Sequence, residues 1–174
     1  VEAEFIIADG SKEKQKKIFD KFRSKKKYYY FGEDKDIKRF LQKKLKGINK
    51  CTKKFIFFCD QDHLVNFKAL KSNEEFLLKN KDYSAAGGGV YFFTYIKKKI
   101  KVIPGLYGEY YFDFKYFFFK YFFNIAFRSH HFLQRKKNAK KIWNLIVKHN
   151  FKDIRSAMFV EDLLTMILGR IKYY

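Results

Sequence analysis

The chain of 174 residues has few prolines, glycines and cysteines and no long apolar run, and these absences exclude several classes of protein. A single proline and nine glycines exclude a collagen-like chain or a flexible linker. The two cysteines, Cys51 and Cys59, lie eight positions apart, which matches no zinc or redox motif, and we expect Cys59 to be a buried, reduced thiol. No apolar run approaches the roughly 20 residues that span a bilayer. We therefore expect a single domain over residues 1–174 in a reducing, cytoplasmic environment.

What the chain has in excess is aromatic side chains and positive charge. Aromatic residues make up 21% of the sequence and hydrophobic residues 47%, which is enough apolar surface to build a core. Lys and Arg total 39 against 18 acids, and the net charge of +21 favours anionic partners such as nucleic acid, anionic lipid or phosphorylated substrates. Only six of these cations are Arg, whose planar fork reads base edges, so nucleic acid is the least expected partner. An A- and T-rich genome also encodes an excess of Lys, Phe and Tyr, so composition alone assigns no function.

The hydrophobic pattern predicts strands that alternate with helices. The predicted strands are residues 4–8, 28–31, 54–59, 90–96, 100–103 and 121–128. Five helices are predicted. In chain order, they begin after Ser11 as a cap, at Asp34 or Asp36, at a capping box at Ser72, at Ser129 and at Asp153. The third strand is a continuous apolar run, typical of a strand that is buried on both faces in a parallel sheet. Residues 85–89 are small and we expect them to be flexible. The alternation indicates βαβ units and an α/β fold.

Two acidic turns follow predicted strands, where ligands bind in open α/β sheets. They are residues 9–11 and residues 60–62. Carboxylates two positions apart, Asp60 and Asp62, can meet one divalent cation, and hard oxygen ligands suit Mg²⁺ or Mn²⁺ bridging a diphosphate. His63 could join them as a ligand or hydrogen-bond donor. Because acidic residues are also common in turns and at helix starts, the motif alone leaves a purely structural role open.

The order of these segments resembles that of the nucleotide-sugar glycosyltransferases with the GT-A fold. Residues 5–11 are similar to their nucleotide-binding turn, and residues 55–62 to the strand end that carries their metal-binding Asp-x-Asp (DXD) motif. Residues 121–128 resemble their later strand that ends in a basic residue, and residues 159–163 resemble their Glu-Asp helix. The nearest resemblance is to a bacterial glycosyltransferase-domain family related to glycosyltransferase family 2, and it covers nearly the whole chain.

The resemblance implies a GT-A, Rossmann-like α/β fold in which a mixed, mostly parallel sheet is flanked by helices. It also implies an additional strand and helix before the Asp-Gly-Ser strand, which we expect this chain to lack. The implied activity is that of a metal-dependent, inverting hexosyltransferase. It would move a sugar from a nucleotide-diphosphate donor, a UDP-sugar before others, to a hydroxyl group of a saccharide or lipid-linked acceptor. Lys-rich faces would allow peripheral contact with an anionic membrane, at its cytoplasmic inner face.

The resemblance assigns roles to the two acidic turns, residue by residue. Asp9, with Gly10 and Ser11, would bind the nucleoside of the donor through its ribose or base. Asp60 would bind the nucleotide diphosphate as well as the metal ion. Asp62 would be the second ligand of Mn²⁺ or Mg²⁺.

The resemblance also implies a general base and further contacts. Asp162, or its neighbour Glu161, would deprotonate the acceptor hydroxyl group. Since both lie on a helix that faces the core, we expect burial to raise the pKa of the base. Arg128, His63 and the pair at residues 130–131 are candidates for contact with the diphosphate or the acceptor.

Two alternative functions stay open at this point. Phosphatases of the haloacid dehalogenase type also place Asp-x-Asp after an apolar strand, but they want Thr or Val where this chain has Leu64, and their motif lies near the start of the fold. A non-enzymatic basic module that binds nucleic acid or an anionic membrane surface is the other alternative. Aromatic residues interleaved with Lys at positions 107–127 could stack on bases or lie at a lipid interface.

Overall fold

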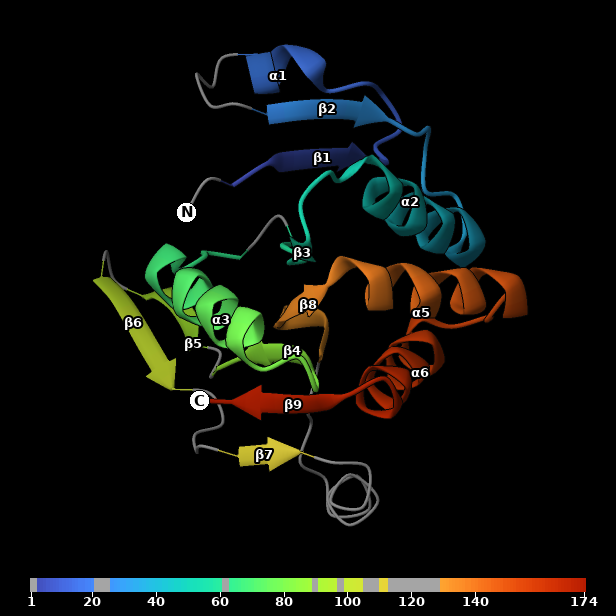
Figure 1. Cartoon of the computed structure of the whole chain (residues 1–174). Coiled ribbons are helices and arrows are strands. Elements are labelled where there is room, and N and C mark those ends of the chain that lie inside the picture. The colour runs from blue at the N-terminus through green and yellow to red at the C-terminus, as the bar shows by residue number, and fades with distance from the viewer. Residues whose placement is uncertain are drawn as a thin grey trace.

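The computed structural model describes residues 3–20, 26–60, 63–88, 91–96, 99–104, 110–112 and 129–174 (Figure 1). Asp62, Arg128, the predicted strand at 121–128 and most of the aromatic segment at 107–127 lie outside these residues. Within the described ranges, no helix has the length and apolar character that crossing a membrane requires.

A five-stranded sheet with the order β3-β8-β4-β9-β7 forms the centre of the fold (Figure 1). Its strands are β3 (Phe55–Ile56), β4 (Tyr83–Gly87), β7 (Tyr110–Phe112), β8 (Leu133–Arg135) and β9 (Arg170–Tyr173). β4 and β9 run parallel, whereas the β3–β8, β4–β8 and β7–β9 pairs are antiparallel. The sheet is mixed, as predicted, but parallel pairs do not predominate among the described strands. An apolar run indicates burial and does not specify the direction of the neighbouring strand.

Two further strand pairs agree with the predicted pattern. The elements are β1 (Phe5–Asp9), α1 (Lys16–Asp20), β2 (Lys26–Tyr30), β5 (Tyr91–Ile96) and β6 (Lys99–Pro104). β1 and β2 are parallel and joined by α1, which makes a βαβ unit, and β5 and β6 form an antiparallel hairpin. The prediction that Ser11 caps the first helix is wrong. α1 begins five positions later, and the hydroxyl group of Ser11 donates to Asp9 instead.

Three of the four longer helices in the described ranges begin at side-chain caps, though not always at the predicted ones. The four are α2 (Ile37–Lys50), α3 (Phe67–Lys79), α5 (Lys136–His149), which begins without a side-chain cap, and α6 (Ile154–Ile167), and η1 (Ser129–His131) is a short 3-10 turn. Asp36 and Asp153 cap α2 and α6, because each side chain accepts a hydrogen bond from the backbone N–H three positions on. The capping box at Ser72 is wrong, since the Asn66 side chain caps α3 earlier. The helix predicted from Ser129 is divided into η1, β8 and α5.

The largest hydrophobic core lies between α2, α5, α6 and β3. Trp143 on α5, the single Trp of the chain, is 1% exposed and packs in one cluster with Leu41 and Ile56. Burying such a side chain contributes roughly 1.5–3 kcal/mol. Of the strand predicted at residues 54–59, only the first half pairs with a neighbour, and Cys59, predicted to be buried, is exposed beyond it. The packing of α2 on α5 places both helices beside the end of β3.

The central strand β4 includes residues 85–87 and so corrects, for these three, the prediction that residues 85–89 are flexible. Ala85 and Ala86 have no exposed surface and pair with strands on both sides. Their small size fits a crowded position, because a Cβ atom at Gly87 would overlap the ring of Phe132. Ala and Gly have low strand propensity, and packing in the middle of a sheet overrides that local preference.

Candidate functional site

The first acidic turn is built around the carboxylate of Asp9. Asp9 ends β1 and is buried, with 6% of its surface exposed. One carboxylate oxygen accepts hydrogen bonds from the backbone N–H (2.9 Å) and the hydroxyl group (2.6 Å) of Ser11. The other accepts from the backbone N–H of Gln15 (3.0 Å) and from the Tyr28 hydroxyl group. Burial acts to raise the pKa of Asp9, but these hydrogen bonds prevail and lower it to about 2. Asp9 is therefore ionised at neutral pH.

Gly10 lies against a second carboxylate that sequence analysis did not identify. The backbone N–H of Asp34 donates to the carbonyl oxygen of Gly10 (2.9 Å), and the Asp34 carboxylate forms an ion pair with Lys43 on α2. A Cβ atom at Gly10 would overlap the Asp34 carboxylate and lie 2.6 Å from Nζ of Lys43. The close approach of this ion pair explains why glycine fits the turn.

The second acidic turn follows β3 and exposes its carboxylate. The side chain of Asp60 is 48% exposed. Its backbone N–H donates to Nδ1 of His63 (3.3 Å), and the backbone N–H of His63 donates to the carbonyl oxygen of Asp60 (3.1 Å), so His63 shapes the turn. Among the residues that the structure describes, no group of three side chains could hold a metal ion. Asp62 lies outside them, and its convergence with Asp60 stays a prediction.

A buried chain of polar side chains leads from Asp60 into the core. His130 on η1 is 1% exposed, and its Nε2 atom lies 2.8 Å from Nζ of Lys44 and 4.0 Å from a carboxylate oxygen of Asp60. Its Nδ1 atom lies 3.3 Å from a carboxylate oxygen of Glu161. Because an ammonium group can only donate, we assign Nε2 as the acceptor and place the ring proton on Nδ1, which donates to Glu161. We call these three residues the Lys44–His130–Glu161 chain.

Aromatic rings hold the outer part of this chain in place. The Nζ atom of Lys44 lies 5.0 to 5.6 Å from the ring centres of Phe40, Phe58 and Trp143. The ring of Phe58 also stacks on the imidazole of His130, with ring centres 4.8 Å apart and planes 7° from parallel. Burial lowers the pKa of Lys44, and the ring faces favour its charged form. The ammonium group is thus fixed beside Asp60.

The inner end of the chain is Glu161, which has no exposed surface. Its second carboxylate oxygen accepts hydrogen bonds from the side chains of Gln134 (3.2 Å) and Trp143 (3.3 Å). Burial acts to raise the pKa of Glu161, but the hydrogen bond from His130 and the charges around it prevail and lower it. The expectation of a raised pKa is therefore wrong for Glu161: burial acts in that direction, but sequence patterning did not reveal the donors and charges that surround the carboxylate and outweigh it.

Asp162 is also buried, at 3% exposure, and points to a different partner. One of its carboxylate oxygens accepts hydrogen bonds from the backbone N–H (2.7 Å) and the hydroxyl group (2.6 Å) of Ser129. Thr165 lies one turn further along α6, and its hydroxyl group is 3.4 Å from that of Ser129. Asp162 therefore anchors η1 to α6, at the point where the chain leaves the undescribed segment that contains Arg128.

Helix α2 connects the two acidic turns through consecutive lysines. Lys43 reaches the Asp34 carboxylate over the first turn, and Lys44 reaches His130 and the second turn. The sequence carried a signal for Lys44 that was missed. It falls on the apolar stripe of α2, three residues after the buried Leu41 and four before the buried Ile48, where a lysine must find partners inside the protein.

Comparison with known proteins gives one match. The model of a family described as glycosyl transferase family 2 matches residues 4–143, about four fifths of the chain. The matched range includes both acidic turns, with Asp9 and Asp60, and ends before Glu161 and Asp162. No curated protein and no solved structure matches the chain.

Proposed function

The chain belongs to glycosyl transferase family 2 and is a glycosyltransferase, and we propose that it moves a hexose from a UDP-sugar to a hydroxyl group of a saccharide or lipid-linked acceptor. The observation that carries this proposal is the ammonium group of Lys44, held by His130 beside the exposed carboxylate of Asp60. A nucleotide diphosphate with its metal ion presents negative phosphate oxygens and a positive ion. The carboxylate suits the metal ion, and the ammonium group suits a phosphate oxygen.

The chemistry of Asp60 fits a divalent metal ion, Mn²⁺ or Mg²⁺. Its carboxylate is about half exposed, and its oxygen lies 4.0 Å from Nε2 of His130, beyond hydrogen-bond distance, so it is open to an ion. Such ions are often held by one or two carboxylates, with water and substrate phosphates as the other ligands, so Asp60 and Asp62 would suffice. When bound, the ion would neutralise negative charge on the diphosphate leaving group.

We propose that the first acidic turn receives the nucleoside. Asp9 is ionised, and each of its oxygens already accepts two hydrogen bonds. A ribose hydroxyl group or a base N–H would therefore bind by replacing a side-chain donor, Ser11 or Tyr28, rather than by adding to the set. The ion pair over Gly10 keeps the backbone of the turn in position while this exchange occurs.

For the general base we propose Asp162 rather than Glu161. Glu161 is enclosed and accepts hydrogen bonds from three side chains, so its role is to position His130. Asp162 shares its oxygen with the hydroxyl group of Ser129, which an acceptor hydroxyl group could replace. In an inverting displacement the base takes the acceptor proton, the acceptor oxygen bonds to the anomeric carbon, and the bond from that carbon to the diphosphate breaks.

Calorimetric titration with UDP, with and without Mn²⁺, tests the donor site. We expect metal-dependent binding that is lost in Asp60→Ala and kept in Glu75→Ala, a matched change of an exposed carboxylate on α3. Hydrolysis or transfer of labelled UDP-hexoses then identifies the sugar. UDP binding that is indifferent to both Mn²⁺ and Asp60→Ala would contradict the proposed metal site. Salt-sensitive binding of RNA with no nucleotide binding would favour the non-enzymatic basic module.

A further inference from the structure

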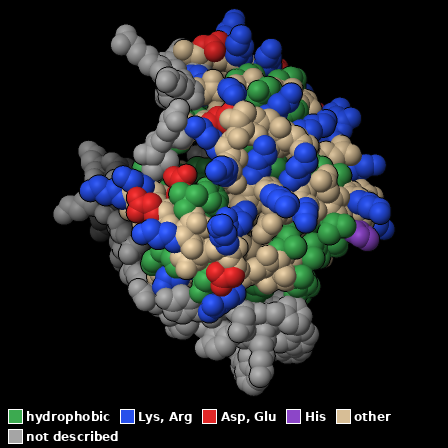
Figure 2. All heavy atoms as spheres, in the orientation of Figure 1, with side chains coloured by type: hydrophobic (Ala, Val, Ile, Leu, Met, Phe, Trp, Pro, Cys, Tyr) green, Lys and Arg blue, Asp and Glu red, His purple; other side chains and the backbone are tan. Residues whose placement is uncertain are grey.

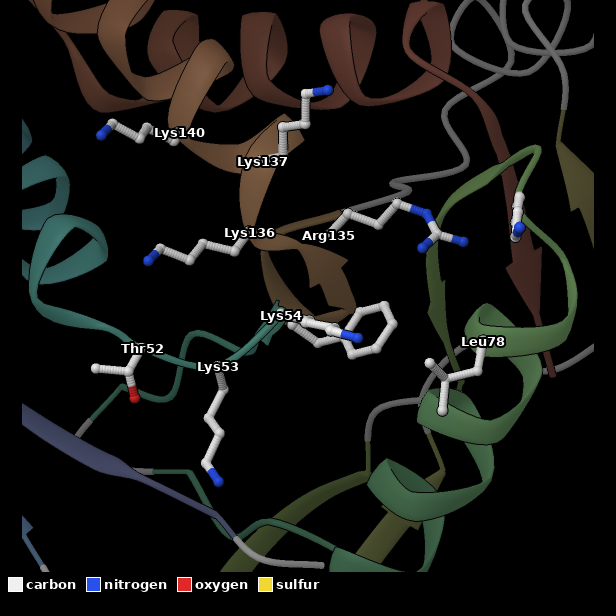
Figure 3. Close-up of a pocket in the computed structure, with 10 residues that line it drawn as sticks. Thr52, Lys53, Lys54, Leu78, Arg135, Lys136, Lys137 and Lys140 are labelled. Carbon is white, nitrogen blue, oxygen red and sulfur yellow. The ribbon is translucent and has the colours of Figure 1, made fainter.

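A groove with a strongly positive lining lies beside the start of β3 (Figure 3). Asp60 comes after that strand in the chain and is not part of the lining. The volume of the groove is about 610 Å³. Ten described residues line it, from β3 and the segment before it, the end of α3 and the turn after it, the end of β8 and the start of α5: Thr52, Lys53, Lys54, Phe55, Leu78, Lys81, Arg135, Lys136, Lys137 and Lys140. Seven of these are cations and none is an acid. The groove therefore suits an anionic partner at a surface separate from the proposed donor site.

Arg135 and Lys136 are among the cations of the groove that the protein itself already engages. The guanidinium group of Arg135 donates to the carbonyl oxygens that end α3 and begin β4, at distances of 2.6 to 2.9 Å. Figure 3 shows it turned toward that end of α3, away from Lys136 and Lys140. The ammonium group of Lys136 donates to the carbonyl oxygen of Cys51. The charge offered to a partner is thus carried by exposed lysines, chiefly Lys54, Lys137 and Lys140.

Apolar surface accompanies the lysines. Leu78, at the groove, is 52% exposed. Phe67, eleven positions earlier and so on the same side of α3, is 46% exposed. Figure 2 shows Lys and Arg side chains spread over the face formed by α2, α3 and α5, with few acidic groups among them. Amphipathic surfaces with Lys beside exposed Leu and Phe are typical of proteins that lie on membranes.

The same details disfavour nucleic acid as the occupant. Base recognition uses Arg forks, and the one Arg in the groove is bound to backbone carbonyl groups. Single-stranded nucleic acid stacks on open aromatic faces, but the guanidinium carbon of Arg135 lies 5.6 Å from the ring centre of Phe55 and covers that ring. A lysine ammonium group acts as a point charge, and its attraction to an anionic lipid surface needs no fixed hydrogen-bond geometry.

We propose that this groove, with the lysines and Leu78 around it, docks the protein on a membrane surface that contains anionic phospholipids. Asp60 is not among the residues that line the groove, so docking would use side chains other than those of the proposed metal site. The inference concerns where the protein binds and does not depend on the sugar-transfer reaction. Each lysine near such a surface strengthens binding about fivefold, and several act together here.

Sedimentation with phosphatidylcholine vesicles, with and without phosphatidylglycerol, tests the proposal on the full chain. We expect binding to the anionic vesicles only, weakened between about 0.1 M and about 1 M salt as the screening length falls from about 10 to about 3 Å. The double change Lys54→Glu with Lys137→Glu should lower binding by roughly tenfold or more. The matched pair Lys14→Glu with Lys17→Glu, exposed lysines near α1, should lower it much less.

A second comparison separates the apolar contribution from charge. Leu78→Ser should weaken vesicle binding severalfold, whereas Leu145→Ser, at an exposed leucine outside the groove, should not. If charge reversal impairs folding, as thermal melting would show, Lys54→Gln with Lys137→Gln replaces it. Equal binding to neutral vesicles, or equal losses for both lysine pairs, would overturn the proposal. So would binding of single-stranded RNA that exceeds vesicle binding at the same salt and is lost in the groove variant.

Discussion

The Nζ atom of Lys44 lies 2.8 Å from Nε2 of His130, although 86 positions separate the two residues in the chain. Through the other ring nitrogen, His130 contacts Glu161, so the imidazole connects a buried carboxylate with a partly buried ammonium group. The opposite charges compensate each other across the ring, which makes their burial tolerable. Asp60, at the exposed end, meets an ammonium group whose position the core has already fixed.

Replacing Glu161 should lower the stability of the protein. In the native protein, one carboxylate oxygen of Glu161 faces Nδ1 of His130 and the other faces the side chains of Gln134 and Trp143. In Glu161→Gln, an amide nitrogen replaces one of these oxygens, so in either orientation it faces a hydrogen-bond donor. The substitution also removes one of the two carboxylates, Glu161 and Asp60, whose charges favour the charged form of Lys44. We expect the free energy of unfolding in urea to fall by about 3 kcal/mol. Adding Lys44→Met should recover part of the loss, and strictly additive changes would contradict the coupling.

Replacing Lys44 alone tests its role toward the diphosphate. Met is one atom shorter than Lys, but it is unbranched and packs well on the rings that surround Lys44. Because Lys44→Met also removes a charge that compensates the buried Glu161, we expect some loss of stability, and binding is measured at a temperature where thermal melting shows the variant to be folded. Loss of a charged hydrogen bond to a phosphate oxygen should weaken UDP binding by roughly tenfold to a hundredfold in calorimetry. Lys46→Met, at an exposed position on the same helix, is the control. Equal affinities in the two variants would remove Lys44 from the donor site.

The pKa of Asp9 predicts a particular pH dependence of stability. The pKa of Asp9 is about 2 in the folded protein, against an ordinary value of 3.8 that applies to the unfolded chain. The ionised group therefore stabilises the fold above about pH 4, and this contribution is lost as the pH falls through 2. It amounts to about 2 kcal/mol. We expect Asp9→Asn to be less stable than the native chain near pH 6 in urea titrations, with a difference that shrinks toward pH 2. A difference independent of pH would contradict this explanation.

Replacing each of two glycines by alanine should change the free energy of unfolding in opposite directions. At Gly169, φ is +154° and a Cβ atom would lie 2.7 Å from the carbonyl oxygen of Asp82 and 3.0 Å from the backbone nitrogen of Ser84. We expect Gly169→Ala to lower the free energy of unfolding by about 2 kcal/mol or more. At Gly47, inside α2, the nearest atom is 3.7 Å away, so Gly47→Ala should raise it by about 0.5–1 kcal/mol. Thermal melting of both variants checks the two signs.

Prediction from sequence succeeded where the determining contacts are local. Asp36 and Asp153 cap helices through backbone groups three positions away; Asp153 was identified, and Asp36 was one of two candidates for its helix. It failed where another side chain competes. Ser11 resembles a helix cap, but its hydroxyl group donates to Asp9, whose carboxylate also accepts a hydrogen bond from Tyr28 on β2. The strand β4 was missed because Ala and Gly become strand residues only under the packing of a central sheet.

The amino-acid sequence alone determined the two acidic turns, the amphipathic helices and the excess of lysine, because these depend on residue order and on short-range hydrogen bonds. It also determined that an ionisable group, Lys44, falls on an apolar helix face. Only the tertiary structure decided that Lys44 meets His130 and Glu161, and that Glu161 is enclosed while Asp60 stays exposed. The physical reason is that the packing of α2, α5 and α6 around β3 sets desolvation and hydrogen-bond partners, and residues far apart in the chain supply them.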